Sequence, residues 1–192
     1  AFNGCQSLET VTFAEGSQLE ILQDRAFLNC TALEGITLPA SLKEIRVSNS
    51  SFEFEGETYR MVRSRVFENC AAMKYVDMSA CAEVLMIPGE MFSGCISVET
   101  LLLPPNLETI HDFAFGNRKE DNGNVIYGLT SLKEITIPAT VTSIGGYAFN
   151  GCQSLETVTF AEGSPITALG TAEAVAGSLA GQYVFANTTA LN

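Results

Sequence analysis

The stretch that governs the whole chain is AFNGCQSLETVTFAEGS, which occupies residues 1–17 and returns letter for letter at residues 148–164. A match of this length does not arise from composition, so the chain contains a duplicated unit. Weaker copies of the pattern lie between the two: AFLNCTALEGITLP from Ala26, VFENCAAMKYVDM from Val66 and MFSGCISVETLLLP from Met91. Such repetition indicates a repeat protein, in which each unit packs mainly on its neighbours.

The units align on one phenylalanine that follows a small or aliphatic residue. These phenylalanines are Phe2, Phe27, Phe67, Phe92, Phe115, Phe149 and Phe185, and their successive spacings are 25, 40, 25, 23, 34 and 36 residues. The short spacings define the basic unit, which falls within the range of about 20–29 residues typical of leucine-rich repeats. The longer spacings are that unit plus an insertion.

Each unit contains a strand and a turn segment. The segment LETVTF from Leu155 alternates apolar and polar residues, as a half-buried strand does, and it returns as LEGITL, VETLLL and LKEITI. Pro39, Pro104 and Pro138 follow these segments directly and end the strands, because proline donates no ladder hydrogen bond. The preceding A-F-x-x-C-x-x-L element has the apolar spacing of one or two helical turns.

Three insertions lengthen the repeat, at about 46–62, 116–128 and 168–182. The first, with Phe52 and Phe54 alternating before Gly56, predicts a hairpin. The second is polar and rich in Gly and Asn, which favours a surface loop. The third, ALGTAEAVAGSLAGQ, has the composition of a short helix. Insertions of this kind are either tolerated decoration or places where function was added.

Five of the six cysteines occupy one position of the unit: Cys5, Cys30, Cys70, Cys95 and Cys152. Leu129 and Thr188 take that position in the other two units, so it accepts a core filler of small to medium size rather than a disulfide partner. We predict a ladder of reduced, buried thiols, although an even count is also compatible with a disulfide framework. Cys81 lies outside the pattern and is predicted to be the most reactive thiol.

Composition and motifs exclude several classes of function. The net charge of −12 and pI near 4.4 disfavour binding to nucleic acid or anionic membranes, and no apolar run is long enough to span a bilayer. His111 and Asp112 are neighbours in an extended segment and point to opposite faces, so they do not form a catalytic pair. No metal-binding, nucleophile or phosphate-loop motif is present. We therefore predict no catalysis, cofactor or metal.

The strands leave one regular set of residues facing outward. We predict a binding surface made of Thr12, Thr37, Tyr75, Asp77, Thr100, Leu102, Glu134, Thr136 and Thr159, together with Thr10, Gly35 and Thr157. A charged row, Glu9, Glu34, Lys74, Glu99, Lys133 and Glu156, runs beside it. Threonine is also what β-propensity alone selects on a strand. Tyr75 and Leu102 are the outward residues that propensity explains least.

The unit A-F-x-x-C-x-x-L-x-x-I-x-[LI]-P, complete at Ser143–Cys152 (SIGGYAFNGC), resembles the BspA-type leucine-rich repeat. The resemblance covers the chain apart from the insertions. It implies a bacterial cell-surface or secreted protein that adheres to host matrix proteins, host cells or other microbes. Val66-Phe67 and Met91-Phe92 depart from Ala-Phe without affecting the fold. The family has no shared binding residues that could be transferred.

We therefore expect a right-handed leucine-rich repeat solenoid of the α/β horseshoe class, rich in strands, with short helical turns and a parallel concave β-sheet. We expect residues 1–192 to form one solenoid cut from a longer array, because the chain opens and closes within a unit. The expected function is non-enzymatic, adhesin-like binding of a protein or glycoprotein at an extracellular or cell-surface location. Two alternatives stay open: a stalk that presents another domain, and a glycan-binding module using Tyr127 and Tyr147 near the second insertion.

Overall fold

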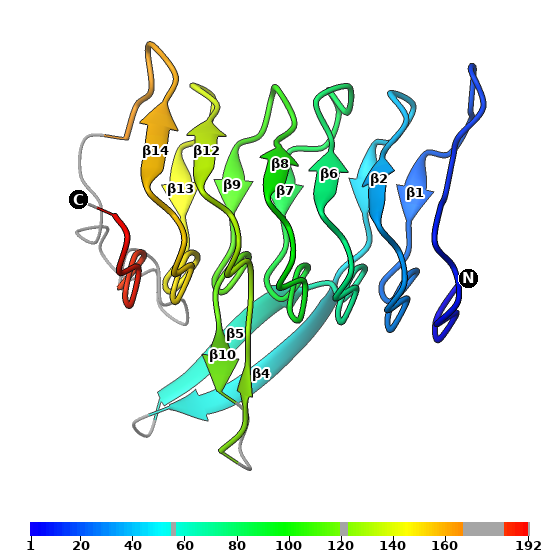
Figure 1. Cartoon of the computed structure of the whole chain (residues 1–192). Coiled ribbons are helices and arrows are strands. Elements are labelled where there is room, and N and C mark those ends of the chain that lie inside the picture. The colour runs from blue at the N-terminus through cyan, green and yellow to red at the C-terminus, as the bar shows by residue number, and fades with distance from the viewer. Residues whose placement is uncertain (55–56, 120–122, 167–182, 192) are drawn as a thin grey trace.

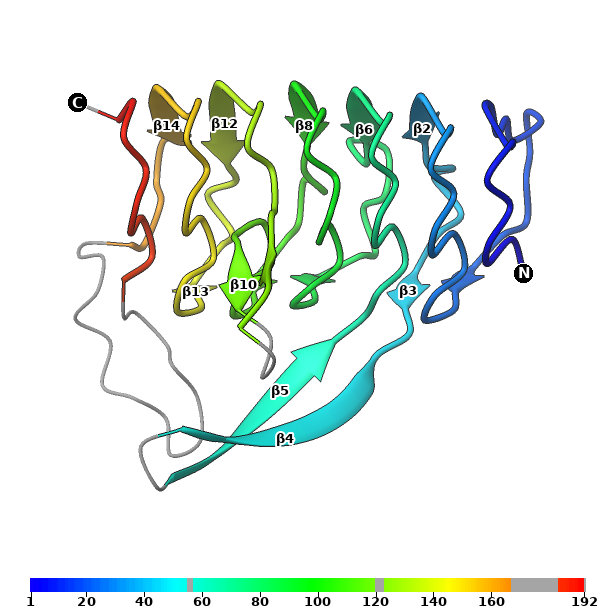
Figure 2. The same cartoon turned by 60° about the horizontal axis from the view of Figure 1, so that its bottom comes forward.

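The structure, a computed structural model, describes residues 1–54, 57–119, 123–166 and 183–191 of the 192-residue chain. Successive coils stack side by side along one axis, with the first unit at one end and the last at the other (Figure 1). Each complete coil carries one strand on each of two opposite sides (Figure 2). The described residues form no helix, and so none that is long and apolar enough to cross a membrane.

The strands of one side, which we call the front strands, are those predicted from the alternating segments. They are β2 (Gly35–Thr37), β6 (Tyr75–Asp77), β8 (Thr100–Leu102), β12 (Glu134–Ile137) and β14 (Thr157–Phe160). β2, β6 and β8 form one parallel sheet and β12 and β14 form another. β8 and β12 are neighbours without pairing. The outward side of these five strands is called the front face below. It includes the exposed charged residues directly before the strands (Glu34, Lys74, Glu99, Lys133 and Glu156) and the equivalent residues 9–12 of the first unit.

The opposite side carries shorter strands, which we call the rear strands. They are β1 (Ile21–Leu22), β3 (Glu44–Ile45), β7 (Met86–Ile87), β9 (Thr109–Ile110) and β13 (Ser143–Ile144). They also pair in parallel, β1 with β3, and β7 with β9 and then β13. β3 and β7 do not pair, and the first insertion leaves the solenoid between them.

The first insertion is a hairpin, as predicted. β4 (Ser48–Phe54) and β5 (Glu57–Arg63) pair antiparallel from Ser48↔Arg63 to Phe54↔Glu57. The second insertion is more ordered than the predicted loop, because β10 (Arg118–Lys119) and β11 (Val125–Ile126) form a short antiparallel hairpin. Both hairpins project from the same edge of the solenoid (Figure 1). The predicted helix at 168–182 lies outside the described residues.

The A-F-x-x-C-x-x-L element forms successive tight turns, not the helical turns that its apolar spacing predicts. In the second unit the Cys30 amide donates to the Phe27 carbonyl at 3.1 Å, and the Leu33 amide donates to the Cys30 carbonyl at 3.0 Å. Asn29, which lies between Phe27 and Cys30, has a φ of 61°, and its equivalents Asn69 and Gly94 have φ of 62° and 79°. A residue in this left-handed conformation cannot continue a right-handed helix, so the chain turns a corner instead.

The aligned phenylalanines form one continuous stack inside the solenoid. Successive rings lie with centroids 5.3, 5.6, 5.8, 5.9, 4.9 and 5.1 Å apart, in the order Phe2, Phe27, Phe67, Phe92, Phe115, Phe149 and Phe185. Leu, Ile, Val and Met side chains from both sets of strands complete a single core around the stack. The rings therefore stack in the same order in which the sequence aligns the units.

The cysteine ladder is buried at four of its five positions. Each of these thiols donates to the phenylalanine carbonyl of the coil before it: Cys30 to Phe2 at 3.1 Å, Cys70 to Phe27 at 3.2 Å, Cys95 to Phe67 at 2.9 Å and Cys152 to Phe115 at 3.6 Å. The thiol is thus both a core filler and a weak donor that joins neighbouring coils. Burial raises the pKa of Cys70 and of Cys152 to about 12.

The prediction for Cys81 is wrong. Its side chain is fully buried, its Sγ lies 3.5 Å from the Pro39 carbonyl oxygen, and burial raises the pKa of this thiol to about 11. It fills the core between strands instead of standing outside it. Cys5 is the exposed thiol. Its equivalents in the ladder are each covered by a preceding coil, and the first coil has none in this chain.

Candidate functional site

The front face brings together the residues predicted to form a binding surface. The cross-strand register aligns Gly35, Tyr75 and Thr100 in one row and Thr37, Asp77 and Leu102 in the next. Across β12 and β14, Glu134 pairs with Thr157, and Thr136 with Thr159. Of the nine residues predicted to form the binding surface, Asp77 is half-buried, and the other eight are exposed: Thr12, Thr37, Tyr75, Thr100, Leu102, Glu134, Thr136 and Thr159. Eight of the nine are thus accessible to a partner, and binding by them stays a prediction.

Tyr75 is held in place by the glycine beside it. A Cβ atom at Gly35 would overlap the Cε1, Cδ1 and Cζ atoms of the Tyr75 ring, so the ring lies over the bare backbone of β2. An aromatic ring that covers a glycine on the adjacent strand is a known way to fill a gap in a sheet surface. Tyr75 as a whole is still 47% exposed, so its ring is supported from below by β2 and accessible from outside.

Leu102 is the second exposed apolar residue of the front face, with 46% of its surface accessible. It lies on β8, one strand along and one row across from Tyr75, a diagonal of about 7–8 Å. Two hollows flank this pair. One, of about 390 Å³, lies on the side of Tyr75, Thr12 and Thr37, and the other, of about 340 Å³, lies between Leu102 and Thr136 where β8 and β12 do not pair.

The charges of the front face are not neutralised by ion pairs. Six carboxylates and two lysines belong to it: Glu9, Glu34, Asp77, Glu99, Glu134 and Glu156, with Lys74 and Lys133. Within the described parts of the chain, none of these side chains forms an ion pair within 4.0 Å. Asp77 accepts hydrogen bonds from the amide and hydroxyl of Ser79 at 2.9 and 2.6 Å. The face is exposed, regular and acidic.

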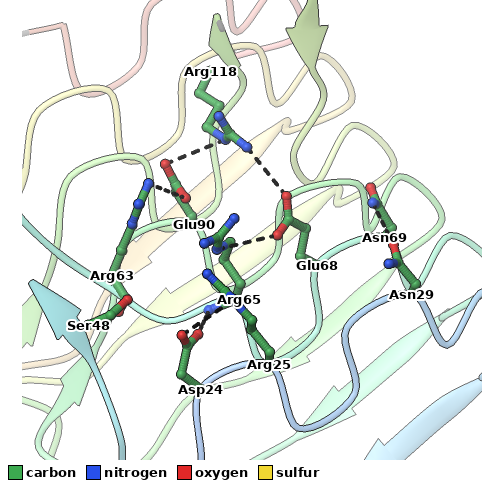
Figure 3. A network of polar contacts seen from close by, with 10 residues as sticks. All are labelled: Asp24, Arg25, Asn29, Ser48, Arg63, Arg65, Glu68, Asn69, Glu90 and Arg118. Carbon is green, nitrogen blue, oxygen red and sulfur yellow. Dashed lines mark hydrogen bonds and ion pairs between the residues drawn. The ribbon is translucent and has the colours of Figure 1, made fainter. Parts of the chain in front are cut away.

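The edge from which the hairpins project carries a different arrangement, shown in Figure 3. Arg118 of β10 reaches two buried carboxylates of the solenoid, Glu68 at 3.3 Å and Glu90 at 3.5 Å. Arg63 of β5 also pairs with Glu90, at 3.4 Å, and Arg65 pairs with Glu68 at 3.7 Å. We call these five residues the arginine–glutamate cluster. The cluster joins the hairpins of the first and second insertions to the same two coils.

Burial determines the character of this cluster. Glu68 and Glu90 expose only 7% and 2% of their surfaces. Burial raises the pKa of the Glu68 carboxyl above its ordinary value, and it outweighs the Arg65 and Arg118 guanidiniums, which act in the opposite direction. Asp24 adds a further link, because its Oδ1 accepts from the Arg65 amide at 2.8 Å. Such a buried network fixes the geometry of the hairpins more surely than it adds stability.

The remaining candidates do not assemble into a site. Asp112 Oδ1 accepts from the Gly146 amide at 2.7 Å, so this carboxylate holds the next coil, and burial lowers the pKa of the His111 imidazole. Tyr147 stacks on Phe113 and Tyr183 at 5.1 and 5.3 Å, which leaves Tyr127, 50% exposed, as the accessible aromatic of the two predicted for glycans. The described residues contain no group of three His, Cys, Asp or Glu side chains that could hold a metal ion.

Comparison with known families accounts for the repeat geometry. The model of the BspA type leucine rich repeat region matches six copies in this chain, over residues 1–57, 48–125 and 120–172. The chain belongs to the BspA-type leucine-rich repeat family. Its six matched copies span both hairpins and the whole of the front face, so the fold described above is that of this family.

Solved structures agree with this assignment. A leucine-rich cell surface protein from Faecalibacterium prausnitzii is 28% identical with a TM-score of 0.59, over 83% of this chain and 35% of that one. A leucine-rich repeat protein from Bacteroides ovatus is 32% identical with a TM-score of 0.54, over 73% of this chain and 29% of that one. The chain thus spans about a third of the length of these two proteins. No curated protein matches it.

Sequence reasoning found the front face and missed the arginine–glutamate cluster. The front face follows from alternation within the repeat, which places every second strand residue outward. The cluster depends on Arg63 and Arg118, which lie in the insertions and follow no repeat position. A signal was nevertheless present: in a chain with only ten Lys and Arg residues, Arg60, Arg63, Arg65, Arg118 and Lys119 are concentrated in and beside the first two insertions.

Proposed function

We propose that this protein is a non-enzymatic, adhesin-like binding protein of the bacterial surface or secreted fraction, and that it recognises host or microbial macromolecules through the front face. The observation that carries the proposal is the state of that face. Its charged groups, apart from the half-buried Asp77, are exposed and form no ion pairs in the described chain, and two large exposed side chains, Tyr75 and Leu102, lie among them. Exposed aromatic and aliphatic anchors within a polar rim are typical of protein interfaces.

Two further observations support the location and the class of partner. The related protein from Faecalibacterium prausnitzii is described as a leucine-rich cell surface protein. Solenoids of stacked repeats present extended surfaces on which a macromolecule, rather than a small ligand, finds enough area. The hollows beside Tyr75 and Leu102 are shallow parts of that surface rather than enclosed ligand pockets.

The test is binding of the purified protein to immobilised matrix glycoproteins, mucin and glycans. The double variant Tyr75→Ser with Leu102→Ser removes both anchors and leaves the net charge unchanged. Its matched control is Leu85→Ser with Met86→Ser on the rear side, where the two residues are 44% and 38% exposed. We expect the front variant to lose at least about tenfold in affinity, as anchor residues do, and the rear variant to bind as the parent does.

Equal loss in both variants, with far-UV circular dichroism unchanged, would contradict a role for the front face. Absence of any saturable binding would favour a stalk that presents another domain. The exposed Tyr127 supports one alternative, glycan binding at the second insertion. In that case Tyr127→Ser abolishes binding to glycans, and both double variants bind glycans as the parent does.

A further inference from the structure

We propose that the partner of the front face is a cationic, extended polypeptide segment, whose lysine and arginine side chains meet the carboxylates and whose apolar or cationic side chains pack on Tyr75 and Leu102. This inference rests on the proposed function, because it names the chemistry of the partner for the same surface. It follows from the distribution of charge over the molecule and from the geometry of the two anchors.

Ion pairs are distributed unequally over the two sides of the solenoid. Every ion pair found in the described residues lies away from the front face, and together these pairs engage Arg25, Lys43, Arg46, Arg63, Arg65 and Arg118. The front face retains six carboxylates against two lysines, which leaves four negative charges uncompensated. A partner with the opposite charge gains attraction there without first breaking an ion pair of the solenoid.

The two anchors favour a polypeptide. The Tyr75 ring packs with one side on Gly35 and exposes the remainder, which is the geometry that stacks on a proline ring or receives the cation of a lysine or arginine. Leu102 offers an aliphatic contact at a distance that residues two apart on an extended chain can span, about 6.6 Å. Successive coils present their charges about 4.8 Å apart, so an extended segment can meet several of them.

The same charge disfavours other occupants. A second copy of this chain would bring a net charge of −12 to an acidic face, and an acidic glycan or a nucleic acid would be repelled in the same way. A neutral glycan could stack on Tyr75, but its affinity would not depend on the surrounding carboxylates. Dependence on those carboxylates and on salt therefore distinguishes the occupants.

The experiment uses a synthetic peptide of alternating lysine and proline, with a glutamate–proline peptide as its counterpart. Proline keeps both peptides extended and soluble. Binding is measured to the parent chain, to a front variant with Glu99→Lys and Glu134→Lys, and to a rear variant with Glu83→Lys and Glu108→Lys. All four carboxylates are exposed, so the two variants have the same net charge and differ only in where the charge is reversed.

We expect the lysine peptide to bind the parent and the rear variant similarly, the front variant to bind at least about tenfold more weakly, and the glutamate peptide not to bind. Affinity for the parent should fall as salt is raised from about 0.05 M to about 0.5 M. Equal weakening in both variants would overturn the inference, since it would show attraction to net charge alone.

The two proposals fail in distinguishable ways. If the matrix or mucin panel shows binding that requires Tyr75 and Leu102, but the lysine peptide neither binds nor competes, the front face functions and its partner is not cationic. A neutral glycan that competes at high and low salt alike would identify that partner. If neither the panel nor the peptide depends on the front residues, the proposed function itself is wrong.

Discussion

The front face and the arginine–glutamate cluster share one solenoid core but differ in whether their charged side chains form ion pairs. On the front face carboxylates repeat from coil to coil, five of the six are exposed, and none forms an ion pair in the described chain. In the cluster two carboxylates are buried and three arginines surround them. The charged side chains at the repeated positions of the front face are thus free of ion pairs in the described chain, whereas the arginines of the two hairpins pair with carboxylates of the solenoid and hold the hairpins against it.

One continuous core lies beneath both regions, and thiol labelling tests its closure with the largest expected effect. Cys5 should react at the rate of a free thiol, and Cys30, Cys70, Cys81, Cys95 and Cys152 should react slower by about a thousandfold or more, because labelling of a buried group requires opening of the structure. Mass spectrometry after timed exposure to a thiol reagent measures this. Rapid labelling of Cys81 or Cys95 in the folded protein would show that the core is open there.

Removal of one carboxylate should lower the free energy of unfolding much more in the arginine–glutamate cluster than on the front face. Glu90→Gln takes the carboxylate away from Arg63 and Arg118, and we expect the free energy of unfolding to fall by about 2 kcal/mol. Glu99→Gln, its counterpart on the front face, should change it by less than about 0.5 kcal/mol. Urea denaturation followed by circular dichroism gives both values. Equal effects would erase the distinction between the two regions.

A smaller effect is expected from pH at Glu68. Because burial raises the pKa of this carboxyl in the folded state, the folded protein takes up a proton there more readily than the unfolded chain does. The associated stability is fully present below the ordinary value of 4.5 and is lost as pH rises through the folded pKa. The stability of the parent relative to Glu68→Gln should thus increase as pH is lowered from neutral. A decrease would mean that the arginines outweigh burial.

The smallest effect is expected from a substitution that tests whether Gly35 sets the position of the Tyr75 ring on the front face. Gly35→Thr restores the residue found at the equivalent Thr10, Thr100 and Thr157, and should change the free energy of unfolding by less than about 1 kcal/mol. The new Cβ displaces the Tyr75 ring, so near-UV circular dichroism should change and binding to the panel should weaken. An unchanged spectrum together with unchanged binding would show that the position of the ring is not set by Gly35.

Much of the fold could be predicted because each unit repeats the same local physics. Alternation placed Thr37, Tyr75 and Leu102 outward, and the recurring Ala-Phe placed the stacked rings. The helical turns were predicted wrongly because the spacing of apolar residues says nothing about the sign of φ. The second residue after each phenylalanine is Gly or Asn, and in six of the seven units, all but that of Asn117, this residue has a positive φ.

The parts that could not be predicted depend on contacts between distant, non-repeating residues. Arg118 meets Glu68 across 50 positions in the sequence, and no periodicity links them. The role of Gly35 beneath Tyr75 depends on the register between β2 and β6, and the chain that connects these strands includes the β4–β5 hairpin. Cys81 was misjudged because it leaves the cysteine position of the unit yet still points into the core.

The two identical 17-residue stretches make the same junctions with different neighbours. The amides of Phe2 and Gly4 donate to the carbonyls of Ala26 and Leu28, and the amides of Phe149 and Gly151 donate to those of Val184 and Ala186, all at 2.8–2.9 Å. The receiving coils differ in sequence, so these hydrogen bonds, which join backbone groups only, accept different side chains in the receiving coil. Whole units of such an array can be duplicated or removed without a change in the hydrogen bonds that join them, so the length of the solenoid can vary with the number of units.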